Sequence, residues 1–434
     1  MNKLAALIWT ALTLPATAAG AIPLTLQTVQ PLAAAATQPM QTVYEGGRVW
    51  TGGGFEARTL VVENGRFVDP ATARSAALRI PLAGGFVTPA YANAHAHVTQ
   101  PTAESSAGFT DAGVFYVWNP NTVVVSRRSR EFFEEPGRIR LKVAQGGITE
   151  PGGHPEKLYV DLLGPSVYGG RPREWFIGNA FHYGRTEAEI EQALLTLKRQ
   201  GADFVKIYLL NSENYAALKD DPVAYGEKGL NPANVPFLVR RAHAIGLPVL
   251  AHLETAHDLS VATAAGVDYA AHLPAYGVVD ADRAASARIS PELAAEVARS
   301  GMRVIPTYAL GSGGDRPEPN LSDEARRTIE IQTANLAALR GAGVELLTGT
   351  DGFNQIFTEA EHLVNANGLS AGEVATIVFS SGPAMFPERR IGCFDAGCEA
   401  DFLVLGGDPT RDIRALRDIT RRVLAGSELP RPTN

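Results

Sequence analysis

The feature that most constrains the fold is a repeated alternation of helix and short apolar strand between about residues 89 and 382. One unit is complete: Thr186 and Glu189 form the pattern of a capping box, the helix ends at Gly201, and a strand is predicted over 203–209. Further strands, each preceded by a helix pattern, are predicted at 248–252, 269–272, 304–307 and 345–351. Because such units place parallel strands side by side, we predict an α/β fold with a (β/α)8 TIM barrel, and an open doubly wound sheet is the alternative.

Both ends of the chain carry a different, β-rich pattern. Asn64-Gly65 separates two short apolar runs. This dipeptide is favoured in two-residue hairpins because both turn positions need a positive φ. Near the other end, residues 401–405 and 422–424 have a similar strand pattern. We therefore predict one small β-sandwich domain built from residues 41–88 and 383–434, around a barrel over 89–382.

The first 40 residues have the layout of an export signal. Lys3 precedes an apolar stretch of 11 residues, Leu4 to Leu14, and small residues with cleavage sites after Ala18 or Ala21 follow. An internal helix is the alternative. The stretch is too short to span a bilayer, so we expect a signal peptide over 1–21, no membrane insertion after its removal, and a periplasmic or secreted protein. Residues 22–40 lack any period and predict a flexible N-terminus.

Charge and cysteine content narrow the function classes. The 434 residues carry a formal net charge of −7 with no long basic run, so we expect no nucleic-acid partner. A hydrophobic content of 45% excludes a disordered or fibrous chain. The two cysteines, Cys393 and Cys398, flank a four-residue turn, and an oxidising compartment would favour a disulfide there. The alternative is two unpaired, small apolar side chains.

Residues that bind metals stand at or near the ends of several predicted strands. Lys206, His252, His272 and Asp351 occupy these positions, and in a barrel the carboxyl ends of the strands meet at one mouth. An H-x-H motif precedes them, and the strand period of two directs both of its imidazoles to the same side. One H-x-H is a weak signal by itself, whereas the whole ordered set predicts a metal site.

With these residues the sequence resembles the metal-dependent amidohydrolase superfamily, most of all its branch of imidazolonepropionase-like proteins and Xaa-Pro dipeptidases. The resemblance extends over nearly the whole chain after the signal. It is carried by Gly-Gly-Phe-Val-Thr-Pro-Ala before His95-Ala96-His97, Gly266-Val267-Asp268 before His272, Thr348-Gly349-Thr350-Asp351, and residues 399–405. The resemblance implies the barrel, the small β-sandwich and a centre of two divalent metal ions, with Zn²⁺ the favoured metal.

The resemblance also implies a role for each ligand. His95, His97 and Asp351 would hold the more buried ion, and His252 and His272 the more exposed one. Lys206, carbamylated by CO2, would bridge the two, since an unmodified ammonium would repel both cations. Asp351 would also act as general base. An alternative for Asp351 is a helix N-cap, and an alternative for Lys206 is an ordinary surface lysine.

Substrate contacts are predicted at three further residues. His154 lies in a Gly-Gly-His segment similar to one in related hydrolases, and Tyr208 and Tyr276 follow metal-site strands and would bind an oxyanion or a carboxylate. Packing at the rim of the barrel is the alternative for both tyrosines. The deaminases of the superfamily carry H-x-x-E at the fifth strand. Here Glu254 stands two residues after His252, which weighs against a deaminase.

The sequence thus predicts an exported, metal-dependent amidohydrolase that cleaves an amide or peptide-like C–N bond of a small molecule. A lactonase or phosphotriesterase using the same centre, and a non-catalytic binding protein on this fold, remain alternatives. The resemblance is compatible with a homo-oligomer and does not fix the substrate, which loops determine.

Overall fold

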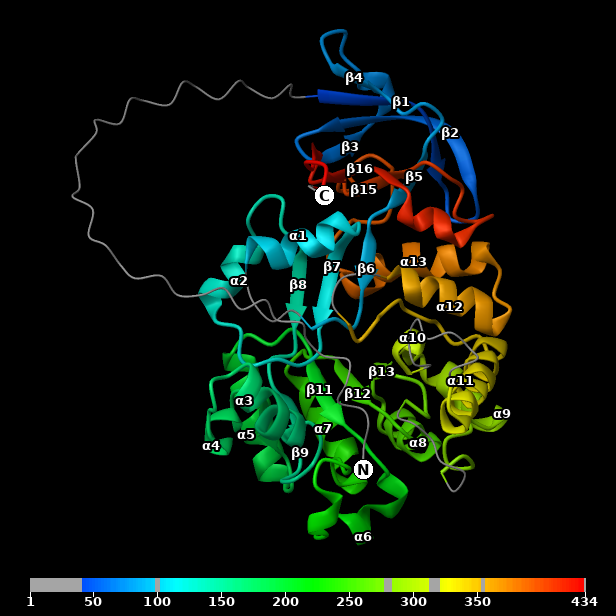
Figure 1. Cartoon of the computed structure of the whole chain (residues 1–434). Coiled ribbons are helices and arrows are strands. Elements are labelled where there is room, and N and C mark those ends of the chain that lie inside the picture. Colours follow the sequence, from blue (N-terminus) through cyan, green and yellow to red (C-terminus); the bar gives the residue numbers. More distant parts are fainter. Residues whose placement is uncertain (1–40, 98–101, 277–282, 312–320, 353–355, 433–434) are drawn as a thin grey trace, which may run out of the picture. The chain divides into compact units, whose positions relative to one another are not determined.

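The computed structural model describes residues 41–97, 102–276, 283–311, 321–352 and 356–432 (Figure 1). The predicted signal peptide (1–21) and flexible N-terminus (22–40) lie outside the described residues. Within the described ranges, no helix is both long and apolar enough to cross a membrane.

Parallel strands form two sheets in the central part of the chain. The larger has the order β10-β9-β11-β12-β13-β14 and the smaller β6-β7-β8. Their bounds are β6 (Tyr91–Asn93), β7 (Val114–Asn119), β8 (Arg140–Val143), β9 (Gly147–Thr149), β10 (Phe181–Tyr183), β11 (Val205–Tyr208), β12 (Val249–His252), β13 (Tyr269–Ala271) and β14 (Arg303–Ile305). Every residue of β11, β12 and β13 is buried, as expected for parallel strands covered on both faces.

Single bridges extend this parallel pairing beyond the named strands. Val304 pairs with Leu346, and Ala96 pairs with Gly352, both in parallel. The backbone N–H of Ala94 also donates to the carbonyl of Thr348 at 2.8 Å. The strand predicted at 345–351 is therefore present as a bridged segment next to both β14 and the chain after β6.

Helices follow or precede the strands in the predicted alternation. The bounds are α1 (Ala103–Asp111), α2 (Arg127–Phe133), α3 (Gly164–Ser166), α4 (Arg173–Phe176), α5 (Glu187–Arg199), α6 (Tyr215–Leu218), α7 (Val235–Ala244), α8 (Ala256–Ala265), α9 (Pro291–Ser300), α10 (Tyr308–Gly311), α11 (Asp323–Gly341), α12 (Phe357–Asn367) and α13 (Ala371–Met385). Helix α13 runs across the boundary predicted at 382–383.

Local signals explain where the helices begin and end. At α5 the Thr186 hydroxyl accepts from the backbone N–H of Glu189, but the Glu189 carboxylate accepts from Arg185 instead of Thr186, so the predicted capping box is only half formed. A complete capping box begins α8, where Thr255 and Asp258 cap each other. Gly266 ends that helix with φ 79°, a conformation that costs glycine little.

The two ends of the chain meet in one sheet. Among the described residues eight strands belong to it: β1 (Gln41–Trp50), β2 (Phe55–Glu63), β3 (Arg66–Val68), β4 (Leu78–Pro81), β5 (Phe86–Pro89), β15 (Phe402–Leu405), β16 (Ile419–Leu424) and β17 (Ser427–Glu428). Strand β5 pairs with β1 on one side and antiparallel with β15 on the other, and Figure 1 shows the blue and red strands side by side.

The predicted hairpin and disulfide both lie in this sheet region. Asn64 and Gly65 join β2 to β3 with φ angles of 50° and 76°, so both turn positions have the positive φ that the sequence predicted. Cys393 and Cys398 form a disulfide. The loop that it closes is held against β3, because the Phe67 N–H donates to the carbonyl of Cys398 at 2.9 Å.

Candidate metal centre

The strand ends bring the predicted ligands together. Lys206 lies within β11, His252 is the last residue of β12, and His272 directly follows β13. Both His272 and Asp351 have a positive φ, 76° and 51°. A non-glycine residue pays for such a conformation, and this strain is typical of functional sites.

His95, His97 and Asp351 form the tightest part of the site. The predicted strand stops at Asn93, so both histidines lie just beyond β6. Even so, both present Nε2 to the same carboxylate oxygen: Oδ1 of Asp351 is 3.1 Å from His95 and 2.9 Å from His97. One ligand atom from each of the three residues lies within 4.8 Å of the others, close enough for one metal ion. The helix after Asp351 has Ile356 as its N-cap, so Asp351 does not fill the alternative role of a cap.

His252 and His272 extend the site beyond these three residues. The His272 ring centroid lies 4.7 Å from that of His95 and 4.6 Å from that of His252. All four imidazoles therefore belong to one continuous cluster, which we call the histidine cluster (His95, His97, His252 and His272).

Three of the imidazoles have a nitrogen in contact with a group other than Asp351. Nδ1 of His97 lies 3.1 Å from the carbonyl oxygen of Asn121, and Nδ1 of His272 lies 2.7 Å from the Thr307 hydroxyl. For His252 the engaged nitrogen is Nε2, 3.4 Å from a carboxylate oxygen of Glu254. Histidines that bind metals use such contacts to fix the ring and its tautomer, and the other nitrogen then carries the free lone pair.

Lys206 is buried among these residues without a counterion. Its side chain is 2% exposed, and Nζ has no hydrogen-bond partner among the described residues. Nζ lies 5.5 Å from the centroid of the Tyr208 ring. Burial lowers the pKa of Lys206 to about 7, against a partial opposing effect of Asp351. The alternative of an ordinary surface lysine is therefore wrong.

Burial also sets the charge of the other groups. It lowers the pKa of His95 and of His252 to about 3, so both rings are neutral near pH 7. Burial alone would raise the pKa of Asp351, but the neighbouring His95 and the hydrogen bonds from His95 and His97 outweigh it and hold that pKa well below its usual value. Neutral imidazoles beside an ionised carboxylate are the donor set that divalent transition metals bind.

The three predicted substrate residues border the same cluster. The His154 ring stacks on His252 with a centroid distance of 4.9 Å and an angle of 18°, and lies 5.1 Å from the Tyr208 ring. The Tyr276 ring lies 3.8 Å from His272, and its hydroxyl donates to Oδ2 of Asp351. Burial raises the pKa of Tyr276 well above 10, so it keeps the proton that it donates.

Sequence reasoning missed two partners of the ligands. Thr307, which contacts His272, ends a predicted strand, and the rule that put the metal ligands at strand ends would also have identified it. The partner of His97 at Asn121 is a backbone carbonyl, and no side-chain pattern signals such a group.

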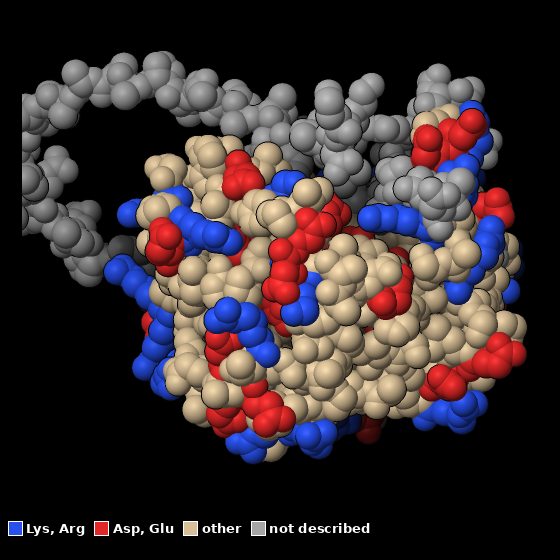
Figure 2. Space-filling model, turned by 90° about the horizontal axis from the view of Figure 1, so that it is seen from below, with Lys and Arg blue, Asp and Glu red and all other residues tan. Residues whose placement is uncertain are grey.

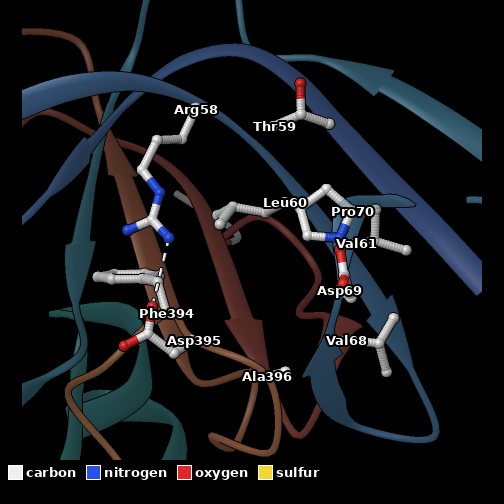
Figure 3. Close-up of a pocket in the computed structure, with 10 residues that line it drawn as sticks. All are labelled: Arg58, Thr59, Leu60, Val61, Val68, Asp69, Pro70, Phe394, Asp395 and Ala396. Atoms are coloured by element: carbon white, nitrogen blue, oxygen red, sulfur yellow. Dashed lines mark hydrogen bonds and ion pairs between the residues drawn. The ribbon is translucent and has the colours of Figure 1, made fainter. Parts of the chain in front are cut away.

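A second cavity and the charged surface contain none of the predicted metal ligands. A cavity of about 200 Å³ lies in the region of the terminal strands, where Arg58 and Asp395 face each other at 3.3 Å (Figure 3). None of the residues that line it belongs to the histidine cluster. On the face drawn in Figure 2, acidic and basic side chains are interspersed.

No protein-family model matches the sequence, and no curated protein matches it. Solved structures do match it over most of its length. An amidohydrolase is 19% identical, with a TM-score of 0.67 over 91% of this chain and 100% of that one. A Xaa-Pro dipeptidase with bound methionine in its active site is 18% identical, with a TM-score of 0.68 over 90% and 99%. The ochratoxinase of A. niger is 15% identical, with a TM-score of 0.68 over 91% and 96%.

The chain has an amidohydrolase-type fold. At these identities the likeness concerns the fold, and at that level it confirms the resemblance to the amidohydrolases and Xaa-Pro dipeptidases that the sequence predicted. By their names these neighbours are an amidohydrolase, a Xaa-Pro dipeptidase and an ochratoxinase, and their chains are covered almost completely, so this chain has the whole extent of that fold.

Proposed function

We propose that this protein is a metal-dependent hydrolase that cleaves an amide or peptide-like C–N bond in a small molecule. The observation that carries the proposal is the convergence of four imidazoles, an ionised Asp351 and a buried, unpartnered Lys206 amine at one set of strand ends. The amidohydrolase-type fold supports the same reaction class.

We further propose that the parallel strands form one closed eight-stranded barrel. The support is a chain of neighbours: β6 to β7 to β8, β9 to β11, then β12, β13 and β14. Strand β8 continues into β9 after three residues, and the 346–352 segment bridges β14 to the chain after β6. In such a barrel the carboxyl ends of the strands share one mouth.

The donor set fits two divalent cations, with Zn²⁺ the favoured ion. His95, His97 and Asp351 would hold one, and His252 and His272 the other. Nδ1 of His95 and Nζ of Lys206 are buried and have no partner in the part of the chain that the structure describes, which is compatible with a site whose groups serve a ligand rather than one another. When bound, such cations polarise a carbonyl and lower the pKa of a water molecule.

The residues of the chain would then act as follows. Asp351 accepts the proton of the attacking water and delivers it to the leaving nitrogen. His95 and His97 fix the carboxylate, and Tyr276 keeps a protonated hydroxyl beside it as a donor for a developing oxyanion or a substrate carboxylate. His154 and Tyr208 line the approach next to His252.

Lys206 would be carbamylated, and this gives the first test. Its neutral amine attacks CO2, an N–C bond forms and one proton is released, which leaves an anion able to neutralise the cations. Lys206→Ala is expected to bind less metal, measured by elemental analysis, and to lose activity. Added short carboxylic acids should restore part of both. A bare ammonium in high-resolution density of the fully metal-loaded, active protein would contradict the carbamate.

The reaction class is tested by a substrate screen. The purified, metal-loaded protein should hydrolyse one or more of N-acyl amino acids, Xaa-Pro dipeptides and cyclic amides. Turnover of lactones or aryl esters alone would contradict C–N hydrolysis, and a metal-loaded protein inert to every compound would indicate a binding protein.

We also propose export, on the order of Lys3, the apolar stretch and the small residues in the first 21 positions. N-terminal sequencing of material from a host periplasm should find the chain beginning after Ala18 or Ala21. Retention of Met1 on a cytosolic product would contradict export.

A further inference from the structure

The two chain segments that carry His95 and Asp351 lie directly against each other. The N–H of Ala94 donates to the carbonyl of Thr348 at 2.8 Å, and the N–H of Asp351 donates to the carbonyl of His95 at 2.8 Å. An added Cβ at Gly349 would lie 3.0 Å from the backbone nitrogen of His95, which is tighter than an ordinary contact, so glycine permits this approach. The separation of the two predicted ligands therefore depends on how these segments are held together.

Asn93, the last residue of β6, joins the two segments through its side chain. Its Oδ1 accepts from the N–H of His95 at 3.1 Å and from the N–H of Thr350 at 3.3 Å, and its Nδ2 donates to the Thr350 hydroxyl oxygen at 2.9 Å. The same hydroxyl oxygen accepts from the N–H of Gly352 at 3.1 Å. One amide thus holds the backbone of His95 and, directly or through Thr350, the residues on both sides of Asp351.

Burial makes these contacts of Asn93 hard to replace. The residue is 0% exposed, so water does not take the place of its partners, and a buried polar group that loses a partner costs free energy. Asp351 has a φ of 51°, a conformation that persists only where its surroundings hold it. The amide is therefore placed to hold the turn that brings Oδ1 of Asp351 to 3.1 Å from Nε2 of His95.

We propose that Asn93 is a positioning residue, which sets the separation of His95 from Asp351 and through it the metal affinity and the rate of hydrolysis. This role rests on the proposed hydrolase function and adds to it a residue that neither ligates metal nor contacts substrate. The physical reason is geometry. Groups that orient metal ligands are typically worth ~10–100-fold in metal affinity or activity, and a displacement of ~1 Å at a reacting group can cost ~100-fold in rate.

The first experiment uses Asn93→Leu, which keeps a branched side chain and removes all three contacts. Titration of the metal-free protein with Co²⁺, followed by visible absorption, should show a ~10–100-fold lower affinity than the wild type. With an amide that the wild type hydrolyses, kcat should fall over the same range while KM stays near its wild-type value, because Asn93 does not contact substrate. Wild-type affinity and kcat in a folded but less stable variant would overturn the proposal.

Asn93→Asp provides the rescue. It keeps an oxygen for the N–H groups of His95 and Thr350, and its second oxygen can accept the proton of the Thr350 hydroxyl, which reverses the direction of that hydrogen bond. The variant should therefore recover most of the Co²⁺ affinity and kcat that Asn93→Leu loses. Equal losses in the two variants would overturn the assignment of the positioning role to Oδ1.

Thr350 tests the other end of the same contact, and it is not fully buried, so its variants disturb the fold less. Thr350→Val should lower Co²⁺ affinity and kcat by less than Asn93→Leu, and Thr350→Ser should behave as wild type. Because both residues act through one contact, the double variant of Asn93→Leu with Thr350→Val should lose less than the product of the two single effects. If Asn93→Leu does not fold, wild-type Co²⁺ affinity in Thr350→Val would overturn the proposal.

Asn335 on α11 offers the matched control. It is 1% exposed and also makes three hydrogen bonds, one from the N–H of Ile289 and two to the carbonyls of Pro274 and Ala287. Asn335→Leu should lose stability and keep the wild-type Co²⁺ affinity. A loss equal to that of Asn93→Leu would overturn the specific role of Asn93. A wild type that binds Co²⁺ but hydrolyses no amide would instead contradict the proposed function, and the Co²⁺ affinities of the variants would still decide the positioning role.

Discussion

The histidine cluster and the eight-stranded sheet of the chain ends differ in the kind of buried polar group that they contain. In the cluster, Lys206 Nζ and His95 Nδ1 are buried without partners among the described residues. In the sheet, β1 and β2 pair over most of their length, and aromatic rings fill the interior, as with Tyr44 against Phe402 at 5.1 Å. Among the described strands of the sheet, the Thr88 hydroxyl is the one buried side-chain group without a partner, whereas the cluster leaves an amine and an imidazole nitrogen available to a ligand.

This difference indicates that the sheet contributes mainly to stability and the histidine cluster mainly to function. Unpartnered buried groups and positive φ angles at non-glycine residues cost free energy, so they persist only where the surrounding structure holds them. Substitutions in the cluster should therefore change activity more than stability, and substitutions in the sheet should do the reverse. Four predictions test this contrast.

The largest effect is expected at Asp351. Asp351→Asn keeps the size of the side chain but cannot accept a proton, so kcat should fall ~10²–10⁴-fold. The variant should stay folded by circular dichroism and retain part of its metal. A wild-type kcat would refute Asp351 as the general base.

The next effect concerns Glu359 on α12, outside the cluster. Burial raises its pKa to about 7, against the hydrogen bonds from Ala309 and Tyr308. Between pH ~4.5 and about 7 the folded state therefore holds a proton that the unfolded state has released. The stabilisation that this group gives the folded state is complete below pH ~4.5 and is lost as the pH rises through about 7.

Glu359→Gln should remove that pH dependence, worth at most about 3 kcal/mol. Denaturant unfolding gives the change in the free energy of unfolding between pH 5 and pH 8 for the wild type and for the variant. The difference between these two changes measures the effect of Glu359. Parallel curves for the two proteins would show that Glu359 has an ordinary pKa.

A smaller effect on stability is expected from the disulfide. Replacing both Cys393 and Cys398 by serine frees a short loop, which the chain-entropy account values at about 2 kcal/mol. The free energy of unfolding should fall by that amount while kcat stays unchanged. A loss of kcat in the folded variant would contradict the prediction that substitutions in the sheet region change stability and leave activity unchanged.

The smallest effect is expected at the hairpin turn. An added Cβ at Gly65 would lie 2.9 Å from the carbonyl oxygen of Ala425, and its φ is 76°, so Gly65→Ala should cost ~1–2 kcal/mol of stability. Gly53→Ala is the matched control, because a Cβ there meets nothing within 4 Å and the φ is not positive. Equal melting temperatures for both variants would contradict the strain assigned to Gly65.

The sequence predicted the elements well where local signals were complete. Thr255 and Gly266 bound a helix close to where the pattern placed it, and Asn64-Gly65 forms the predicted turn. It predicted the strand at 345–351 less well, because a segment held by isolated bridges has no regular ladder to extend it. The bounds of the sandwich and barrel domains, the export signal and the roles of the ligands stay predictions.

By itself the sequence determined which residue types stand at the strand ends, and so the chemistry that the site can perform. Only the tertiary structure decided how they meet: that Tyr276 donates to Asp351, that Lys206 Nζ has no partner among the described residues, and that His252 lies beside Glu254. The reason is physical. Periodicity and capping act over a few residues, whereas burial and hydrogen bonding at a site depend on strands that lie up to 257 residues apart, as Asn93 and Thr350 do.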